Sequence, residues 1–179
     1  AFAARLALGE MADALLLGAT LLACPNALGN VQSSGWKPLI YMSGTCTSKT
    51  LMAIAGTAGD GVLSVADIME PGNPQWASNS AMTLYKEQVP KYAPDADTQN
   101  AIVAYGWTTA ALLAESLARS PELTRVGVMN TARSLSNVKD VGLLMPGVVM
   151  NVSDKDRFLG ETFQLLQYNL SKQYFELVG

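Results

Sequence analysis

The sequence predicts an α/β fold built on a doubly wound parallel sheet with helices on both faces. Short apolar runs alternate with helix-length segments between residues 14 and 65. Buried strands separated by helices need crossover connections, and these produce a parallel sheet that is covered on both sides. The chain has 179 residues, of which 49% are hydrophobic, so it can bury a substantial core.

The first elements show this alternation directly. Residues 2–11 carry apolar side chains at helical spacing, and residues 14–17 are a continuous apolar run typical of a buried strand. Pro25 suits the first turn of a helix, which we expect to continue over residues 26–34 until Gly35 stops it. The predicted order is helix, strand, helix.

The next segment continues the pattern. Residues 38–42 form a second predicted strand, and residues 43–45 form a turn. Thr47 or Ser48 can cap a short helix that ends near Ile54, and residues 61–65 form a third strand. Together, these elements predict three parallel strands connected by helices.

Beyond the third strand the chain becomes mainly helical. The proline-rich residues 67–78 are expected to cross between two bodies. Helices are predicted over residues 78–92, 98–119 and 124–135, and in the long middle helix apolar residues fall roughly along one face: Ile102, Tyr105, Ala110, Leu113 and Leu117. Strands are predicted at residues 147–150, 163–170 and 174–177, the last two as a hairpin.

Composition excludes several classes of function. Charged residues make up 15% of the chain and the net charge is -3 with no basic stripe, so we expect no nucleic-acid partner. The longest apolar stretch, residues 14–24, is about half the ~20 residues of a spanning helix, which predicts no transmembrane segment. The chain has no histidine, and no nucleophile–base pair or phosphate-binding loop is visible, so we expect no enzyme, no metal site and no cofactor.

Two loops are the candidate ligand-binding segments. In an open parallel sheet, ligands bind where loops leave the carboxyl ends of the strands. The loops after the first and second predicted strands supply hydroxyl groups and backbone amides, and Tyr41 or Leu21 offers apolar contact. The alternative is that these are ordinary turn residues. The candidates are Ala19, Thr20, Leu21, Tyr41, Ser43, Gly44 and Thr45.

Several segments resemble one known family, in the right order along nearly the whole chain. They are ADALLLGA, SSGWKPLIY, LMAIAG, GDGVLSV, YGWTTAALLAESLARS, ELTRVGVMNTARSL and LLMPGVVMNVSDKDRFLGETFQLLQYN. Together they resemble the type I periplasmic solute-binding proteins of ABC transporters, the family of extracellular receptors for branched-chain amino acids. The resemblance implies a Rossmann-like, two-lobed periplasmic-binding-protein type I fold that closes like a hinge on a small molecule.

The resemblance also implies a division of the chain as the C-terminal part of such a protein. Residues 1–65 would form the second half of lobe two, residues 66–149 the crossing and a helical contribution to lobe one, and residues 150–179 the return to lobe two. The implied function is capture of an amino acid or related solute and its delivery to a membrane permease. The implied location is periplasmic or extracellular. One form of this location is attachment to the membrane through a lipid anchor on a preceding N-terminal segment. A ligand-sensing domain of the same fold in a signalling protein is the alternative.

Two positions of the family's ligand-binding site can be matched to residues of this chain. Amino-acid-binding members place a tyrosine in the first loop and an ammonium-binding glutamate in the second, where this chain has Thr20 and Gly44. A ligand ammonium would lose a charge-assisted hydrogen bond worth about 1.5–3 kcal/mol. A neutral solute, an acidic solute or an aromatic acid therefore fits the loops as well as an amino acid does.

The two cysteines are Cys24 and Cys46, which could be buried thiols or a disulfide. Each follows one of two strands expected to be neighbours, so the loops can approach within the ~4.4–6.8 Å Cα separation of a disulfide. An exported receptor matures in an oxidising compartment, and no third cysteine is left over. We therefore predict that Cys24 and Cys46 are bonded.

Overall fold

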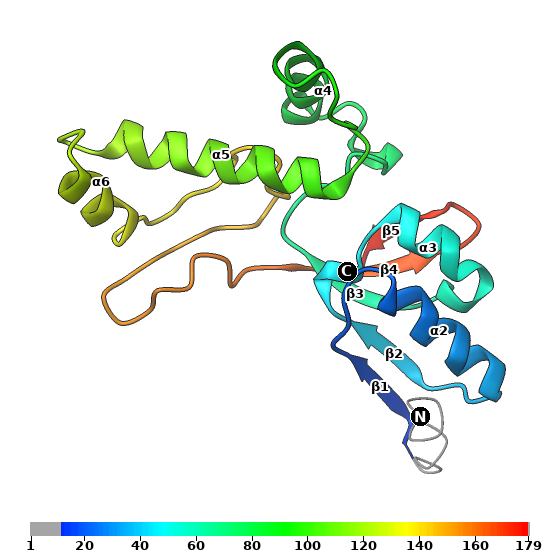
Figure 1. Ribbon diagram of the computed structural model, residues 1–179. Coiled ribbons are helices and arrows are strands. Elements are labelled where there is room, and N and C mark those ends of the chain that lie inside the picture. Colours follow the sequence, from blue (N-terminus) through cyan, green and yellow to red (C-terminus); the bar gives the residue numbers. More distant parts are fainter. Residues whose placement is uncertain (1–11, 179) are drawn as a thin grey trace. The chain divides into compact units, whose positions relative to one another are not determined.

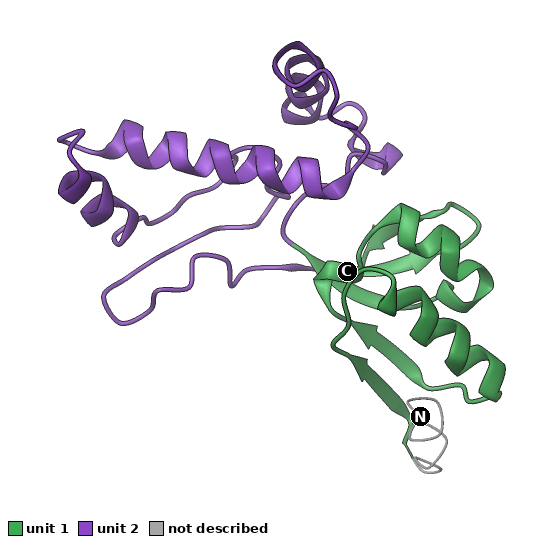
Figure 2. Ribbon diagram, in the orientation of Figure 1, with its two compact units in different colours: residues 1–66, 165–179 green, residues 67–164 purple. Residues whose placement is uncertain are grey.

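The structure is a computed structural model, and it describes residues 12–178. The predicted helix over residues 2–11 lies outside this range. The chain forms two compact units (Figure 2): residues 1–66 with residues 165–179, and residues 67–164. The sheet and its helices belong to the first unit, and the second is mainly helical.

The first unit contains a five-stranded sheet in the order β1-β2-β3-β4-β5. Its strands are β1 (Ala14–Leu17), β2 (Leu39–Met42), β3 (Leu63–Ala66), β4 (Gln164–Asn169) and β5 (Tyr174–Leu177). β1, β2 and β3 pair in parallel, whereas β4 and β5 form the predicted antiparallel hairpin (Figure 1). The predicted α/β fold with an open, largely parallel sheet is confirmed.

Two helices connect the parallel strands. The first, α2 (Ala23–Ser34), begins before Pro25 and ends at Gly35, whose φ of 74° is the left-handed conformation that glycine adopts without strain. The second, α3 (Lys49–Ala55), packs against α2. α2 exposes mostly polar residues and buries its apolar ones, among them Leu28 and Val31.

The second unit contains the helices α4 (Ser80–Tyr92), α5 (Ala101–Arg119) and α6 (Arg125–Ala132). Each begins after a side-chain cap: Asn79, Asn100 and Thr124 accept hydrogen bonds from backbone N–H groups of the first turn. Thr124 is the predicted cap of α6.

The core of this unit lies on one side of α4 and α5. Met82, Tyr85 and Val89 lie on one face of α4 and are buried. Tyr85 meets the Trp107 ring of α5 edge to face, with the ring centroids 5.8 Å apart. These contacts join the two helices.

One expectation about this unit is wrong. Residues 147–150 form no strand, because Gly147 has a φ of 84° and the segment makes only an isolated bridge between Val138 and Met150. The apolar residues that the sequence aligns along one face of α5 are solvent-exposed in this structure: Ile102, Tyr105, Leu113 and Leu117 are exposed, whereas Ala104 and Thr108 are buried.

Among the described residues, α5 is the one helix long and apolar enough to cross a membrane, judged by length and composition alone. Core helices of soluble proteins have the same length and composition, so the absence of a transmembrane segment stays a prediction.

Candidate ligand-binding loops

The parallel pairing of β1 and β2 brings the candidate loops together. Their register pairs Ala14 with Leu39 and Leu17 with Met42, so both strands end at the same edge of the sheet. The Ser43 N–H continues this ladder by donating to the Leu17 carbonyl at 3.0 Å. The loops after both strands therefore start side by side.

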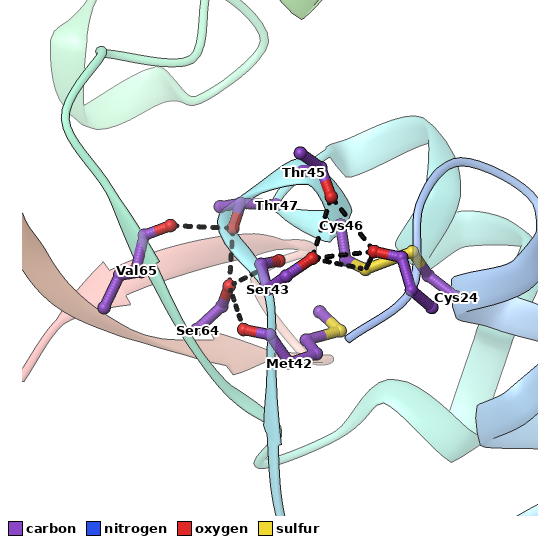
Figure 3. Close-up of a disulfide and its surroundings, with 9 residues drawn as sticks. Cys24, Met42, Ser43, Thr45, Cys46, Thr47, Ser64 and Val65 are labelled. Carbon is purple, nitrogen blue, oxygen red and sulfur yellow. Dashed lines mark hydrogen bonds between the residues drawn. A yellow bond between two sulfur atoms is a disulfide. The ribbon is translucent and has the colours of Figure 1, made fainter. Parts of the chain in front are cut away.

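Hydroxyl groups of the second loop tie it to the first (Figure 3). Ser43 Oγ lies 2.7 Å and Thr45 Oγ1 lies 3.0 Å from the carbonyl oxygen of Ala19, and the two hydroxyls are 2.8 Å apart. Each hydroxyl has one proton, and both protons are used within this cluster. The free capacity of Ser43 and Thr45 toward a ligand is thus their acceptor lone pairs.

A disulfide reinforces the same junction. Cys24, in the first turn of α2, is bonded to Cys46 at the end of the short 3₁₀ helix η1 (Gly44–Cys46), with a Cα–Cα distance of 5.8 Å. Both cysteines are fully buried. The predicted disulfide is confirmed, and it links the two candidate loops covalently.

Gly44 is required by a close approach of two backbones. A Cβ atom at this position would lie 2.8 Å from the carbonyl oxygen of Val65, at the end of β3. Contacts this short force the backbone to move. A glutamate cannot occupy position 44 with the loop in this conformation.

Two residues that were not among the predicted ligand-binding candidates, Ser64 and Thr47, complete the junction. Ser64 is fully buried in β3 and donates to the Met42 carbonyl at 3.0 Å. Thr47 Oγ1 lies 2.7 Å from Ser64 Oγ and 3.2 Å from the Val65 carbonyl oxygen (Figure 3). The sequence signal for this contact is a serine inside an otherwise apolar strand, because a buried hydroxyl group needs a hydrogen-bonding partner.

The remaining candidates are accessible at their positions. Thr20 and Leu21 are exposed in the first loop, and Leu21 is 57% exposed with a φ of 50°. This left-handed conformation is uncommon for a leucine and costs roughly 1–2 kcal/mol. Tyr41 is half-buried within β2, next to Leu16 in the register.

The electrostatics of the loops are nearly neutral. Residues 18–24 and 43–48 contain no charged side chain. Asp67, just after β3, has a pKa raised above its usual 3.8, because burial disfavours the charged carboxylate. Among the described residues, no group of three acidic or cysteine side chains is arranged to hold a metal ion.

Three grooves of the described residues lie away from these loops. One of about 720 Å³ runs along the β4–β5 hairpin. The others, of about 530 and 770 Å³, lie beside α5 and α6 in the second unit. Their linings gather no constellation of catalytic groups, so we base the candidate site on the strand-end geometry.

Comparison with known proteins supports this reading of the fold. A family model described as periplasmic binding protein matches residues 2–173. No curated protein sequence matches the chain closely enough to count as a relative.

Solved structures match over nearly the whole chain. The leucine-binding protein LivK from Thermotoga maritima is 15% identical with a TM-score of 0.71, and the match covers 100% of this chain and 48% of that protein. A branched-chain amino-acid ABC transporter protein from Thermus thermophilus, solved with valine, is 16% identical with a TM-score of 0.70 over 98% and 47%. A fatty-acid ABC transporter substrate-binding protein from Thermomonospora curvata is 24% identical with a TM-score of 0.70 over 99% and 44%. The chain spans about half the length of these proteins.

Proposed function

Because this chain belongs to the periplasmic binding protein family, we propose that it is part of the solute-binding component of an ABC transporter. In this role it captures a small organic molecule outside the cytoplasm and delivers it to a membrane permease. Residues 1–65 and 150–179 serve as lobe two, residues 66–149 contribute to lobe one, and the captured solute contacts the loops at the carboxyl ends of β1 and β2.

One observation carries this proposal: the two strand-end loops are joined into a single surface. The Ala19 carbonyl accepts hydrogen bonds from the hydroxyl groups of Ser43 and Thr45, and the Cys24–Cys46 disulfide links the two segments covalently. Loops fixed in this way lose little conformational entropy when a ligand binds. A preorganised, uncharged surface suits capture and release without chemical turnover.

The same contacts indicate the class of solute. With Gly44 pressed against Val65, the second loop has no carboxylate for an ammonium group. Leu21 presents an exposed apolar side chain, and Ser43 and Thr45 offer acceptor lone pairs. These features favour a solute with an apolar body and a neutral hydrogen-bond donor, such as a primary amide, because the lone pairs of Ser43 and Thr45 accept hydrogen bonds and an anionic carboxylate has none to donate.

Calorimetric titration tests the function and the solute class together. We expect the intact protein to bind octanamide or benzamide more tightly than leucine or valine. Leu21→Gly should weaken this binding at least several-fold without unfolding the protein, because glycine adopts the positive φ freely.

The matched control is Leu84→Gly, at an exposed leucine on α4. It should leave the affinity unchanged, although a glycine inside a helix lowers stability by about 1 kcal/mol. Tighter binding of leucine than of either amide would contradict the solute class. No detectable heat with any of the four compounds would contradict their capture by this protein.

A further inference from the structure

Three planar polar side chains line the groove that runs along the β4–β5 hairpin. They are Asp60, in the turn before β3, and Gln167 and Asn169, both in β4. The volume of the groove is about 720 Å³. Small-molecule sites are clefts of roughly 300–1,000 Å³ in which a few polar groups stand among apolar ones. The groove therefore has the size of such a site.

The groove is separate from the candidate ligand-binding loops. The Gly61 N–H donates to the Tyr168 carbonyl at 3.0 Å, and the Tyr168 N–H donates to the Val62 carbonyl at 2.9 Å. These bonds place β4 beside the segment that enters β3, so the groove lies at the amino end of β3. The candidate loops lie at the other end of the parallel strands, where β1 and β2 finish. A ligand bound in the groove does not occupy those loops.

Backbone groups hold two of the three side chains in position. Asp60 Oδ1 accepts a hydrogen bond from the Leu170 N–H at 3.1 Å. Gln167 Nε2 donates to the Gly61 carbonyl at 3.1 Å. The partners are 110 and 106 residues apart in the sequence, so the fold sets the direction of both side chains.

The amide of Asn169 is fixed at both of its polar atoms. Its Nδ2 donates to Glu176 Oε2 at 2.7 Å, and its Oδ1 accepts from the Ser171 hydroxyl at 2.7 Å and from the Lys172 N–H at 3.2 Å. Lys172 Nζ also pairs with Glu176 Oε1 at 2.5 Å. The charge of Glu176 is thus compensated within the hairpin.

Each of the three planar side chains keeps hydrogen-bonding capacity that no described residue uses. Asp60 retains its second carboxylate oxygen, Gln167 its carbonyl oxygen and one N–H, and Asn169 one N–H. The groove therefore offers donors and acceptors together. Because these groups are already fixed, they lose little conformational entropy when a ligand binds.

The chemistry of the lining indicates the class of ligand. An alcohol hydroxyl donates one hydrogen bond and accepts others, so a ligand with several hydroxyls can use the donors and the acceptors of the groove at once. Leu177 and Val178 also line the groove and are 47% and 45% exposed. They can cover the apolar C–H face of a sugar ring, which has hydroxyls around its edge.

Charge argues against an ionic ligand. The charged side chains of the lining are Asp60 and Glu176. The Asp60 carboxylate repels an anion. A polycation meets one uncompensated carboxylate, because Lys172 neutralises Glu176. A neutral ligand fits this balance best.

We infer that the groove along the β4–β5 hairpin is a carbohydrate-binding site. Asp60 accepts a hydrogen bond from a sugar hydroxyl, the amides of Gln167 and Asn169 donate to neighbouring hydroxyl oxygens, and Leu177 contacts the ring. This site adds a second class of ligand and does not rest on the proposed function.

Two-dimensional NMR of the intact protein tests the inference, with cellotetraose, maltotetraose and chitotetraose as probes. We expect at least one of them to shift amide signals of residues 60–61 and 167–171 and to leave those of residues 18–24 and 43–48 unchanged. Asp60→Asn keeps an oxygen that accepts from Leu170 but replaces the unused acceptor by an NH₂ group. It should raise the dissociation constant at least 5-fold.

The matched control is Asp95→Asn, at an exposed position of the second unit, which should leave the dissociation constant unchanged. Gln167→Leu is a second test variant and should weaken binding by a similar factor. Equal affinities of the original protein and both test variants would overturn the inference. Shifts centred on residues 18–24 and 43–48 would also overturn it, because the sugar would then occupy the candidate loops.

A pelleting assay with insoluble peptidoglycan distinguishes the source of the carbohydrate. Retention that Asp60→Asn abolishes would assign the groove to a cell-wall glycan, and shifts with the free tetrasaccharides alone would assign it to soluble sugars. The absence of both, or a response to spermidine alone, would overturn the inference. None of these probes is used in the calorimetric test, so the two proposals fail independently.

Discussion

Ser43 Oγ lies 2.7 Å from the carbonyl oxygen of Ala19, so a side chain from the loop after β2 is bonded to the backbone of the loop after β1. The two residues are 24 positions apart in the sequence. Parallel pairing brings them together, and the hydrogen bond makes their loops behave as one surface.

Ser43→Ala removes this connection. We expect it to lower the free energy of unfolding by about 1 kcal/mol, because Thr45 still donates to Ala19 and the acceptor is not left unpaired. Urea unfolding measures the change. The control is Ser33→Ala, whose hydroxyl bonds only to the Gly29 carbonyl within an exposed part of α2. Equal effects of the two variants would contradict a bridging role for Ser43.

Replacement of Cys24 and Cys46 by alanine removes a cross-link between residues 22 positions apart. In the chain-entropy model this costs about 3 kcal/mol of stability. Thermal unfolding with and without a reductant provides the measurement. The original protein should lose stability on reduction, whereas the double variant should be unaffected by the reductant. An original protein that is also unaffected would show that the bond contributes nothing to stability.

Gly44→Ala brings a methyl group against the Val65 carbonyl oxygen. We expect a loss of about 1–3 kcal/mol in denaturant unfolding, as for other overpacked positions. Gly29→Ala in α2 is the matched control, because a Cβ there meets no atom within 4 Å. It should be neutral or stabilising by up to about 1 kcal/mol. A stable Gly44→Glu variant that acquires affinity for leucine would show that the loop can move aside.

Asp67→Asn tests the buried carboxyl group. Its folded pKa is raised above 3.8 by desolvation, so the folded state binds the proton more tightly than the unfolded state does. The contribution of this group to stability should therefore fall as the pH rises from about 3.8 through the raised pKa, and stay low at neutral pH. The variant should be more stable than the original at pH 7, and the difference should vanish below pH 3.8. Unfolding curves across this pH range measure the difference in free energy of unfolding between the variant and the original protein. Asp95→Asn, at an exposed position, is the control. A variant less stable at pH 7 would contradict the expected direction.

The sequence by itself determined the parallel strands, the helices between them, the C-terminal hairpin and the disulfide. These features depend on local signals. The apolar run of residues 14–17 indicates a strand, of which only Leu17 is buried in the structure, and Gly35 fixes the end of a helix because it adopts a positive φ. Once β1 and β2 are neighbours in parallel, the positions of Cys24 and Cys46 after them make bonding geometrically accessible.

Only the tertiary structure decided how the loops and the long helix are used. The sequence offered Ser43 and Thr45 as ligand donors, but the protons of both hydroxyls are used within the loop cluster, which only the fold assembles. The sequence also aligned the apolar residues of α5 along one face. Which face is buried depends on Leu143, which lies 35 residues beyond Thr108 and bonds to it from the opposite side of the helix. Helical periodicity defines an apolar stripe, but contacts between distant segments determine which side of the helix this unit covers.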